Sequence, residues 1–265
     1  MNKLQIIIIS CFSRIAISFP ALLLLILTVL PTLGVPTGQT ESDPEFYFTI
    51  SFPDNLKHSY HVDFKYSGFN QDTVEVKMPR WMPGYYQIMD YAKDVRNIAA
   101  ADAHGNVIPV ARKGDNGWLI ASIPGNEIVI SYDISTYRKF VATSYTDSSF
   151  AYILPENTFL YVEGLIKIPV TVRIESRKEW DRIATGLDAV EGTTDQYYAP
   201  DFDILYDCPI LIGDLEALPS FEVDGIEHRF IACKPGSFNQ DEFIGDLKKF
   251  IQVSGCRWYV RGGSL

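Results

Sequence analysis

Residues 166–175 read Ile-Lys-Ile-Pro-Val-Thr-Val-Arg-Ile-Glu and carry the clearest secondary-structure signal in the chain. Apolar side chains occupy every second position, which is typical of a β-strand with one buried face. Pro169 lies on the polar side of this run and has no backbone N–H to donate. It therefore predicts an edge strand or a bulge at this point.

The same alternation recurs at residues 46–52 and 128–134. Turn signals separate the strand patterns, at His104-Gly105-Asn106, Asp115-Asn116-Gly117, Pro124-Gly125-Asn126 and Asp224-Gly225. Many short alternating strands with frequent turns predict a mainly β chain, folded as an antiparallel β-sandwich.

The pattern changes near residue 205. Strand-like stretches at 210–215 and 221–233 lead to one predicted amphipathic helix, for which Asn239 and Glu242 form a capping pair. A helical stripe follows, and Gly255 would end the helix: Phe243, Ile244, Leu247, Phe250 and Ile251. Residues 206–265 therefore look like an incomplete α+β segment.

The N-terminal region has the pattern of an export signal. Lys3 and Arg14 precede an apolar run, and Pro31, Gly34 and Pro36 follow it. A positive start, an apolar core and small residues after it predict a secretory signal peptide and linker over residues 1–38, and an exported, periplasmic or extracellular protein. The alternative is an uncleaved membrane anchor, because the apolar stretch is long enough to span a bilayer.

Composition limits the class of partner. Of the 265 residues, 47% are hydrophobic, which is ample for a globular core. The formal net charge is −10, which disfavours nucleic acid as a partner, and anionic membranes too unless the N-terminal segment stays uncleaved. Cys208 and Cys233 flank neighbouring strand patterns and are candidates for a disulfide, with Cys256 left over. Unpaired cysteines are the alternative.

One aromatic run stands out: Met-Pro-Arg-Trp-Met-Pro-Gly-Tyr-Tyr at residues 78–86. Proline fixes φ and glycine permits positive φ, so Pro83-Gly84 predicts a tight turn that holds the flanking aromatic rings in place. Two interpretations remain open. The rings seal one end of the sandwich, or they form an exposed lip with Trp81, Tyr85 and Tyr86 as candidate substrate-binding residues.

This run resembles the Trp-x-Pro-Gly-x-Tyr signature in the N-terminal domain of the glycyl aminopeptidase family, thermolysin-like zinc metallopeptidases that often contain a PDZ domain. Short motifs extend the resemblance over about residues 45–253: Asp94-Val-Arg-Asn-Ile98, Asp102-Ala-His-Gly-Asn106, Trp118, Ile130-Ser-Tyr-Asp-Ile134 and Tyr206-Asp-Cys-Pro-Ile-Leu-Ile-Gly213. The resemblance implies that residues 39–205 are the family's N-terminal β-sandwich and residues 206–265 a truncated beginning of its peptidase domain.

The zinc motif of that family is not found in this sequence. Family members carry His-Glu-x-x-His on a helix, and none of the 4 histidines begins such a motif. His58 and His61 are three apart, but on a strand they would point to opposite faces. Gly225-Ile-Glu-His228 is superficially similar to the family's Gly-Leu-Glu-His segment, yet it follows a hairpin turn. We therefore expect no catalytic residue, no metal ligand and no cofactor in this chain.

The sequence thus predicts a non-catalytic N-terminal part of a metallopeptidase, inactive alone, with a peptidase domain or a peptide as partner. One rival hypothesis is a catalytic half encoded separately that assembles in trans. The other is a stand-alone exported binding module that uses residues 81–91 as its contact surface.

Overall fold

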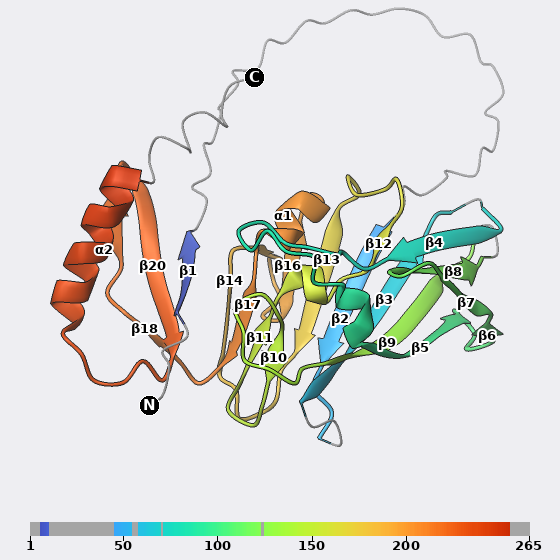
Figure 1. The fold of residues 1–265 in the computed structure, drawn as a ribbon, viewed down its shortest axis with the longest axis horizontal. Helices are drawn as coiled ribbons and strands as arrows, with labels where there is room; N and C mark the ends of the chain where they lie inside the picture. The colour runs from blue at the N-terminus through green and yellow to red at the C-terminus, as the bar shows by residue number, and fades with distance from the viewer. Residues whose placement is uncertain (1–5, 11–44, 55–57, 70, 123–124, 255–265) are drawn as a thin grey trace, which may run out of the picture.

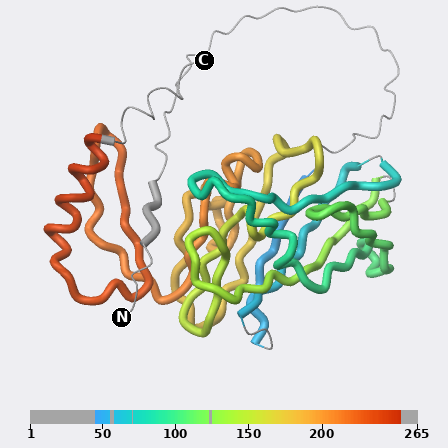
Figure 2. Tube along the Cα trace, viewed as in Figure 1, coloured from blue at the N-terminus to red at the C-terminus, as the bar shows by residue number. Residues whose placement is uncertain are grey.

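The computed structural model describes residues 6–10, 45–54, 58–69, 71–122 and 125–254. Strands dominate these residues, as the alternation predicted. Figure 1 shows a larger β body and, at its side, a smaller unit in which helix α2 (Gln240–Ser254) lies against a short sheet. The tube in Figure 2 follows the same division along the chain, with the last, orange and red part set apart from the rest.

An eight-stranded sheet forms the base of the larger body. Along one strand after another, alternate side chains point into the core, as in β2, where Phe46, Phe48 and Ile50 are buried. This confirms the one-sided strands predicted from the sequence. The order across the sheet is β15 (Asp188–Ala189), β16 (Gln196–Ala199), β13 (Val170–Glu175), β2 (Glu45–Ser51), β3 (Ser59–Ser67), β9 (Ile128–Ser135), β5 (Val95–Asp102) and β6 (Val107–Ile108).

Two four-stranded sheets share the core of the first sheet. One has the order β12 (Tyr161–Val162), β4 (Thr73–Lys77), β8 (Gly117–Ala121) and β7 (Val110–Lys113). The other has the order β10 (Tyr145–Thr146), β11 (Phe150–Ile153), β17 (Ile210–Gly213) and β14 (Arg182–Thr185). Buried residues of all three sheets belong to one apolar cluster, so the predicted β-sandwich is confirmed.

Aromatic rings link the layers of this core. The Phe48 ring stacks on Phe64 with the ring centroids 4.3 Å apart and meets Phe159 edge-on at 4.9 Å. Three short helical segments complete the larger body: η1 (Tyr91–Asp94), η2 (Pro155–Asn157) and α1 (Phe202–Tyr206). The sequence did not predict α1.

Strand β13 departs from the prediction in two ways. It pairs parallel with β2, with Val170 opposite Phe46, although the other strand pairs described are antiparallel. It also lies between β16 and β2, so it is not the edge strand that Pro169 suggested. The proline is accommodated because the strand begins one residue later, at Val170, and no ladder hydrogen bond is lost.

The larger core extends past the expected boundary at residue 205. Ile210, Leu211 and Ile212 of β17 are buried between β11 and β14, and Leu215 belongs to the same cluster. The packing unit seen in the structure therefore runs to about Leu215.

The smaller unit follows directly. Its sheet contains β18 (Leu215–Ala217), β19 (Phe221–Val223) and β20 (Ile226–Cys233), and the β19–β20 hairpin turns at Asp224 and Gly225, both with positive φ. Phe230 of β20 meets Phe243 of α2 edge-on at 4.9 Å. This small second core is separate from the first.

The predicted capping of α2 is confirmed. The Glu242 backbone N–H donates to the Asn239 side-chain oxygen at 3.2 Å, and the Asn239 amide donates back to the Glu242 carboxylate at 3.3 Å. The predicted apolar stripe is only partly used. Phe243, Ile244 and Leu247 pack on the second core, whereas the Phe250 side chain is 65% exposed.

Of the expected signal segment, the structure describes only β1 (Ile6–Ser10), which pairs antiparallel with β20. The predicted apolar core and cleavage region lie outside the described residues, as does Gly255. Among the helices in the described part of the chain, none has the length and apolar character needed to cross a bilayer.

Candidate functional site

The aromatic run forms a closed loop between β4 and η1. Pro83 and Gly84 occupy a turn, with Gly84 at φ +85°, so the predicted turn is confirmed. The base of the loop is fixed twice. The Met89 N–H donates to the Arg80 carbonyl at 2.7 Å, and the Arg80 guanidinium donates to the Asp90 carboxylate at 2.7 Å. The loop is therefore held as a defined projection from the sandwich.

The tip of this loop exposes large apolar side chains. Trp81 is 51% exposed, Tyr86 86% and Ile88 63%, and we call these three residues the aromatic lip. The interpretation that Trp81 seals the end of the sandwich is wrong, because half of its surface faces solvent. The interpretation as an exposed lip agrees with the structure.

A second loop supports the first. Tyr85 is half-buried and meets Phe140 edge-on, with ring centroids 5.0 Å apart. The Tyr91 hydroxyl donates to the Ala142 carbonyl at 3.0 Å. This second loop also exposes Tyr137 and Val141, so large apolar groups of both loops lie on the surface.

A cleft of about 850 Å³ opens beside the lip. Its walls come from the loop, from β12, from η2 and from the end of α1, and they include Arg80, Trp81, Glu156, Tyr161, Tyr206 and Asp207. Trp81 is the one candidate substrate-binding residue of the three that lines this cleft. Tyr85 packs against Phe140, and Tyr86 is 86% exposed.

Glu156 is the unusual residue of the cleft. It lies in η2 and is only 3% exposed, and its Oε2 atom has no hydrogen-bond partner. Burial raises the pKa of this carboxyl to about 7, its own backbone N–H opposes the rise, and the nearby Asp207 carboxylate adds to it. A buried carboxyl oxygen without a donor is costly, so the unpaired Oε2 distinguishes Glu156 from the other acids that the structure describes.

The polar groups around Glu156 are already engaged elsewhere. The hydroxyl of Tyr91 donates to Ala142, that of Tyr152 to the Val141 carbonyl at 3.3 Å, and that of Tyr206 to the Phe159 carbonyl at 3.1 Å. Burial raises the pKa of all three tyrosines, and the negative charge of Glu156 raises each of them further. None of them supplies the missing hydrogen bond.

The basic residues near the cleft are also paired. Arg80 binds Asp90, Lys77 contacts Glu163 at 2.6 Å, and Lys167 contacts Asp201 at 3.2 Å. Burial and the charge of Asp203 raise the pKa of Asp207, at the mouth of the cleft. The cleft therefore combines aromatic walls with two carboxyl groups, those of Glu156 and Asp207, that form no ion pair with a described cation.

The histidines do not form a metal centre. His61 bridges two carboxylates, with its ring nitrogens 2.7 Å from Asp133 and 3.3 Å from Asp63, and these hydrogen bonds raise its pKa to about 9. A protonated imidazole between two acids cannot ligate a metal. Within the described ranges, no group of three or more His, Cys, Asp or Glu residues could hold an ion.

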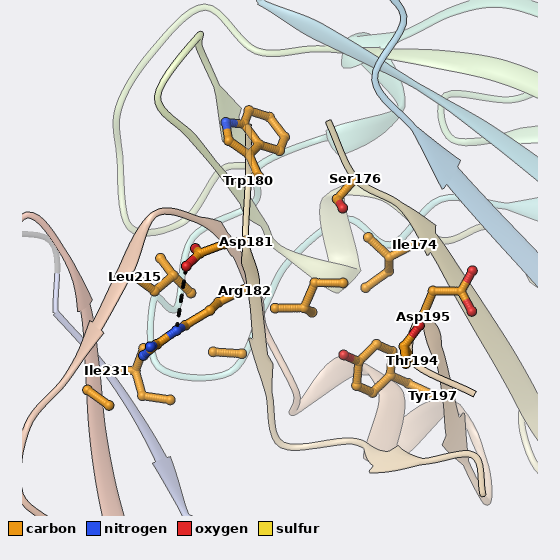
Figure 3. A pocket seen from close by; sticks show the side chains of 13 residues that line it. Ile174, Ser176, Trp180, Asp181, Arg182, Thr194, Asp195, Tyr197, Leu215 and Ile231 are labelled. Carbon is orange, nitrogen blue, oxygen red and sulfur yellow. Dashed lines mark ion pairs between the residues drawn. The ribbon is translucent and has the colours of Figure 1, made fainter. Parts of the chain in front are cut away.

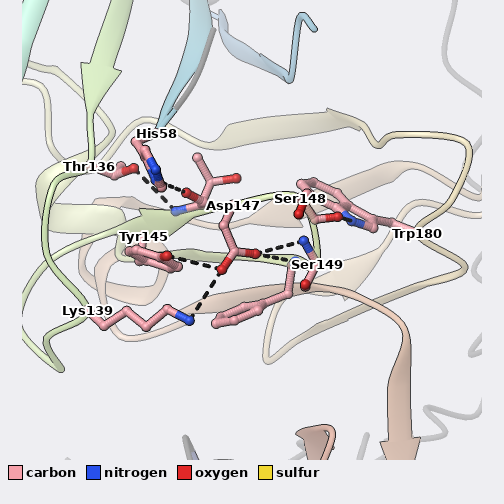
Figure 4. A network of polar contacts seen from close by, with 10 residues as sticks. His58, Thr136, Lys139, Tyr145, Asp147, Ser148, Ser149 and Trp180 are labelled. Atoms are coloured by element: carbon pink, nitrogen blue, oxygen red, sulfur yellow. Dashed lines mark hydrogen bonds and ion pairs between the residues drawn. The ribbon is translucent and has the colours of Figure 1, made fainter.

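A polar network on another part of the surface joins residues around β10 (Figure 4). Asp147 accepts from the Tyr145 hydroxyl at 3.0 Å and pairs with Lys139 at 3.3 Å. His58 donates from Nδ1 to the Thr146 carbonyl at 3.2 Å, which holds its ring near Tyr145. These bonds hold the segment around β10 in place, and among its side chains the buried Thr146 hydroxyl has no partner.

A smaller pocket of about 460 Å³ lies at the seam between the two cores (Figure 3). Trp180 and Ile174 come from the larger body, and Ile231 from β20 of the smaller unit. Its charged groups are neutralised locally, since Arg182 pairs with Asp181 at 3.8 Å and Asp195 with Arg173 at 2.9 Å. We assign no function to this pocket.

Of the two alternatives for Cys208 and Cys233, the structure agrees with unpaired cysteines, because both thiols are free. Cys208 is buried beside Gly186, and burial raises its pKa to about 11. A thiol in that state is neither a nucleophile nor a metal ligand at neutral pH.

Sequence reasoning missed Glu156. One signal was present: it is the only charged residue in Phe-Ala-Tyr-Ile-Leu-Pro-Glu-Asn-Thr-Phe-Leu at 150–160, a stretch that is buried throughout. The cleft itself could not be read from the sequence, because its walls come from five separate segments, one of them the turn that contains Asn116.

Comparisons with known proteins agree with this architecture. The family described as the peptidase M61 N-terminal domain matches residues 47–214. Among solved structures, the aminopeptidase N family protein from Idiomarina loihiensis has 25% sequence identity and a TM-score of 0.69, and the match covers 78% of this chain but 35% of that one. The M1 zinc metallopeptidase from Deinococcus radiodurans has 11% identity and a TM-score of 0.39, with coverage of 70% and 46%. No curated protein matches the chain.

Proposed function

Because the chain belongs to the peptidase M61 N-terminal domain family, we propose that residues 45–215 are the non-catalytic N-terminal domain of a glycyl-aminopeptidase-like metallopeptidase. In this role the domain supports a peptidase domain and forms one wall of its substrate cleft. The observation that carries the proposal is the aromatic lip beside the Glu156 cleft. A free-standing surface rarely exposes such large apolar side chains together, whereas a surface that meets another domain or a peptide commonly does.

This chain spans about a third of the length of the Idiomarina loihiensis protein. Within the residues that the structure describes, no group of three or more His, Cys, Asp or Glu residues is placed to hold a zinc ion. His61 is held between Asp63 and Asp133, and the printed sequence contains no His-Glu-x-x-His. We derive no catalytic step through zinc.

The proposal predicts that these 265 residues alone do not hydrolyse peptides. Purified protein should show no cleavage of aminoacyl p-nitroanilides, with or without added zinc, and less than one zinc per chain by elemental analysis. A commercial zinc aminopeptidase serves as the positive control. Cleavage by this protein that a metal chelator abolishes would contradict the proposal.

A chimera tests the supporting role. Residues 45–215 would replace the corresponding part of a catalytically competent glycyl aminopeptidase, and the chimera should retain activity. Trp81→Ala should then raise KM or lower kcat, because Trp81 faces the cleft. Val107→Ala is the matched control, since Val107 is 86% exposed on the edge strand β6 outside the lip. Equal loss in both variants would argue against a specific role for Trp81.

A second candidate is a stand-alone exported module that binds peptides or a protein partner through the same lip. The exposure of Tyr86 and Ile88 favours it as much as it favours the first proposal. The chimera separates the two candidates, because a stand-alone module has no reason to restore a foreign peptidase domain.

A further inference from the structure

The cleft beside the lip contains a buried carboxyl oxygen without a hydrogen-bond partner. Glu156 is 3% exposed and lines the cleft, and its Oε2 atom has no partner. In protein interiors, a buried carboxyl oxygen usually accepts a hydrogen bond from a hydroxyl or an amide, or pairs with a cation. The backbone N–H of Glu156 itself is the one protein donor to this carboxyl among the described residues, and Oε2 is left without a donor.

The walls of the cleft indicate which kind of donor fits. Trp81, Tyr161 and Tyr206 contribute aromatic surface. Glu156 and Asp207 are the acids of the lining with no described ion pair, whereas Arg80, Glu163 and Asp203 are each paired. Anions are disfavoured because both carboxyl groups would repel them. Aromatic faces with a carboxylate nearby are the surroundings that organic cations prefer.

A metal ion fits poorly. Calcium and magnesium need about six oxygen ligands, and in the part of the chain that is described no group of three or more acids, histidines or cysteines is placed to hold a metal ion. The volume of about 850 Å³ is also much larger than an ion requires and is in the range of small-molecule sites.

We propose that the cleft binds the ammonium group of an organic amine, with the Glu156 carboxylate as counter-ion and the indole of Trp81 against the apolar part of the ligand. The amine is one carried on an apolar chain or ring, such as a basic side chain of a peptide. This binding is a property of the chain itself and does not depend on a peptidase domain.

Protonation gives the proposal a distinctive pH dependence. The pKa of Glu156 is about 7, so the free carboxyl is mostly protonated at pH 6 and mostly ionised at pH 8. An ammonium ligand binds the ionised form, so its affinity should rise about tenfold over this range. The other groups that face Glu156 are the hydroxyls of Tyr91, Tyr152 and Tyr206, whose pKa values are raised above 10, and Asp207, whose pKa is raised from 3.8.

Isothermal titration of the full chain with benzylamine tests the proposal. Benzylamine stays protonated at both pH values, and a dissociation constant of about 1 mM is the order expected for a fragment of this size. Benzyl alcohol is the neutral control of the same shape and should not bind measurably. Benzylamine should bind about tenfold more weakly at pH 6 than at pH 8.

Two variants separate Glu156 from the general acidity of the protein. Glu156→Gln keeps the shape of the side chain and removes its charge, and it should weaken benzylamine binding at least about tenfold at pH 8. Glu127→Gln is the control, because Glu127 pairs with Lys65 at 3.3 Å on the sandwich and is not among the residues of the cleft. It should bind benzylamine like the wild type.

Several results would overturn the proposal. These are equal binding of benzylamine and benzyl alcohol, unchanged affinity in Glu156→Gln, affinity that does not change between pH 6 and pH 8, or no binding by the wild type. If Glu156→Gln does not fold, the pH series on the wild type still decides. NMR of the Glu156 side-chain carboxyl then gives the second measurement: its pKa should fall when benzylamine is added, and an unchanged pKa would refute the role of Glu156.

Discussion

Shortening the chain tests where the larger core ends. A chain of residues 39–205 would lack β17, whereas a chain of residues 39–217 would keep it. In the structure, β17 lies between β11 and β14 and pairs with both, so its loss leaves two strands without their partner. We expect the chain of residues 39–205 not to fold and the chain of residues 39–217 to fold.

The magnitude follows from the buried side chains. Ile210, Leu211, Ile212 and Leu215 are 0%, 2%, 0% and 4% exposed. Burying each contributes about 1.5–3 kcal/mol, which gives about 6–12 kcal/mol as an upper estimate. That is as large as the whole stability of an ordinary domain, about 5–15 kcal/mol. Removing these four residues therefore takes away most or all of the stability of the larger body.

Urea unfolding, followed by the fluorescence of the buried Trp118 and Trp180 and by near-ultraviolet circular dichroism, measures the difference. Residues 39–217 should unfold in one cooperative transition, and residues 39–205 should show no such transition. Both chains lack α2 and β20, so the smaller unit cannot explain the difference. A cooperative transition in residues 39–205 within about 2 kcal/mol of the longer chain would refute the reasoning about β17.

Three further predictions concern single features. The pKa of His61 rises from 6.5 to about 9 on folding, so its contribution to stability is complete below pH 6.5 and is lost as the pH rises through about 9. The stability difference between wild type and His61→Gln in urea should therefore shrink with rising pH, and a constant difference would count against it. Trp180→Ala should destabilise the fold by about 3–5 kcal/mol, because Trp180 is 5% exposed, while Trp81→Ala should cost at most about half as much. Urea midpoints compare the two, and equal costs would mean that Trp81 is buried in solution. If the chain is exported and processed, mass spectrometry should find a new N-terminus between about residues 34 and 40, whereas an intact Met1 in the membrane fraction would favour the anchor.

Local patterns predicted the strands well, because a strand with one buried face has apolar residues at every second position of its sequence. Phe46, Phe48 and Ile50 alternate with polar neighbours for the same reason that they point into one core. The capping pair of α2 was readable for a similar reason, since Asn239 and Glu242 interact over three residues.

Contacts between segments that are far apart in the sequence could not be predicted in this way. Pro169 suggested an edge strand. In the structure β13 pairs with β2, a strand more than a hundred residues earlier in the sequence, and local sequence does not show this pairing. Trp81 has the same local sequence whether it is a plug or a lip, and only the packing of other segments decides. Glu156 became a candidate because η2, α1 and the aromatic loop meet in space. Sequence periodicity reports local secondary structure and does not show which distant segments come into contact.

The parallel pair of β2 and β13 also constrains the order of events during synthesis. Phe46 cannot meet Val170 until more than a hundred further residues have left the ribosome, which takes on the order of 10 s at the usual rates of translation. Throughout that interval, one side of β2 offers unpaired N–H and C=O groups to any other strand. The delay raises the risk of aggregation for the nascent chain, and closing so long a loop slows folding further. A cell that makes this protein therefore benefits from a chaperone that covers residues 45–51 until the partner strand is available.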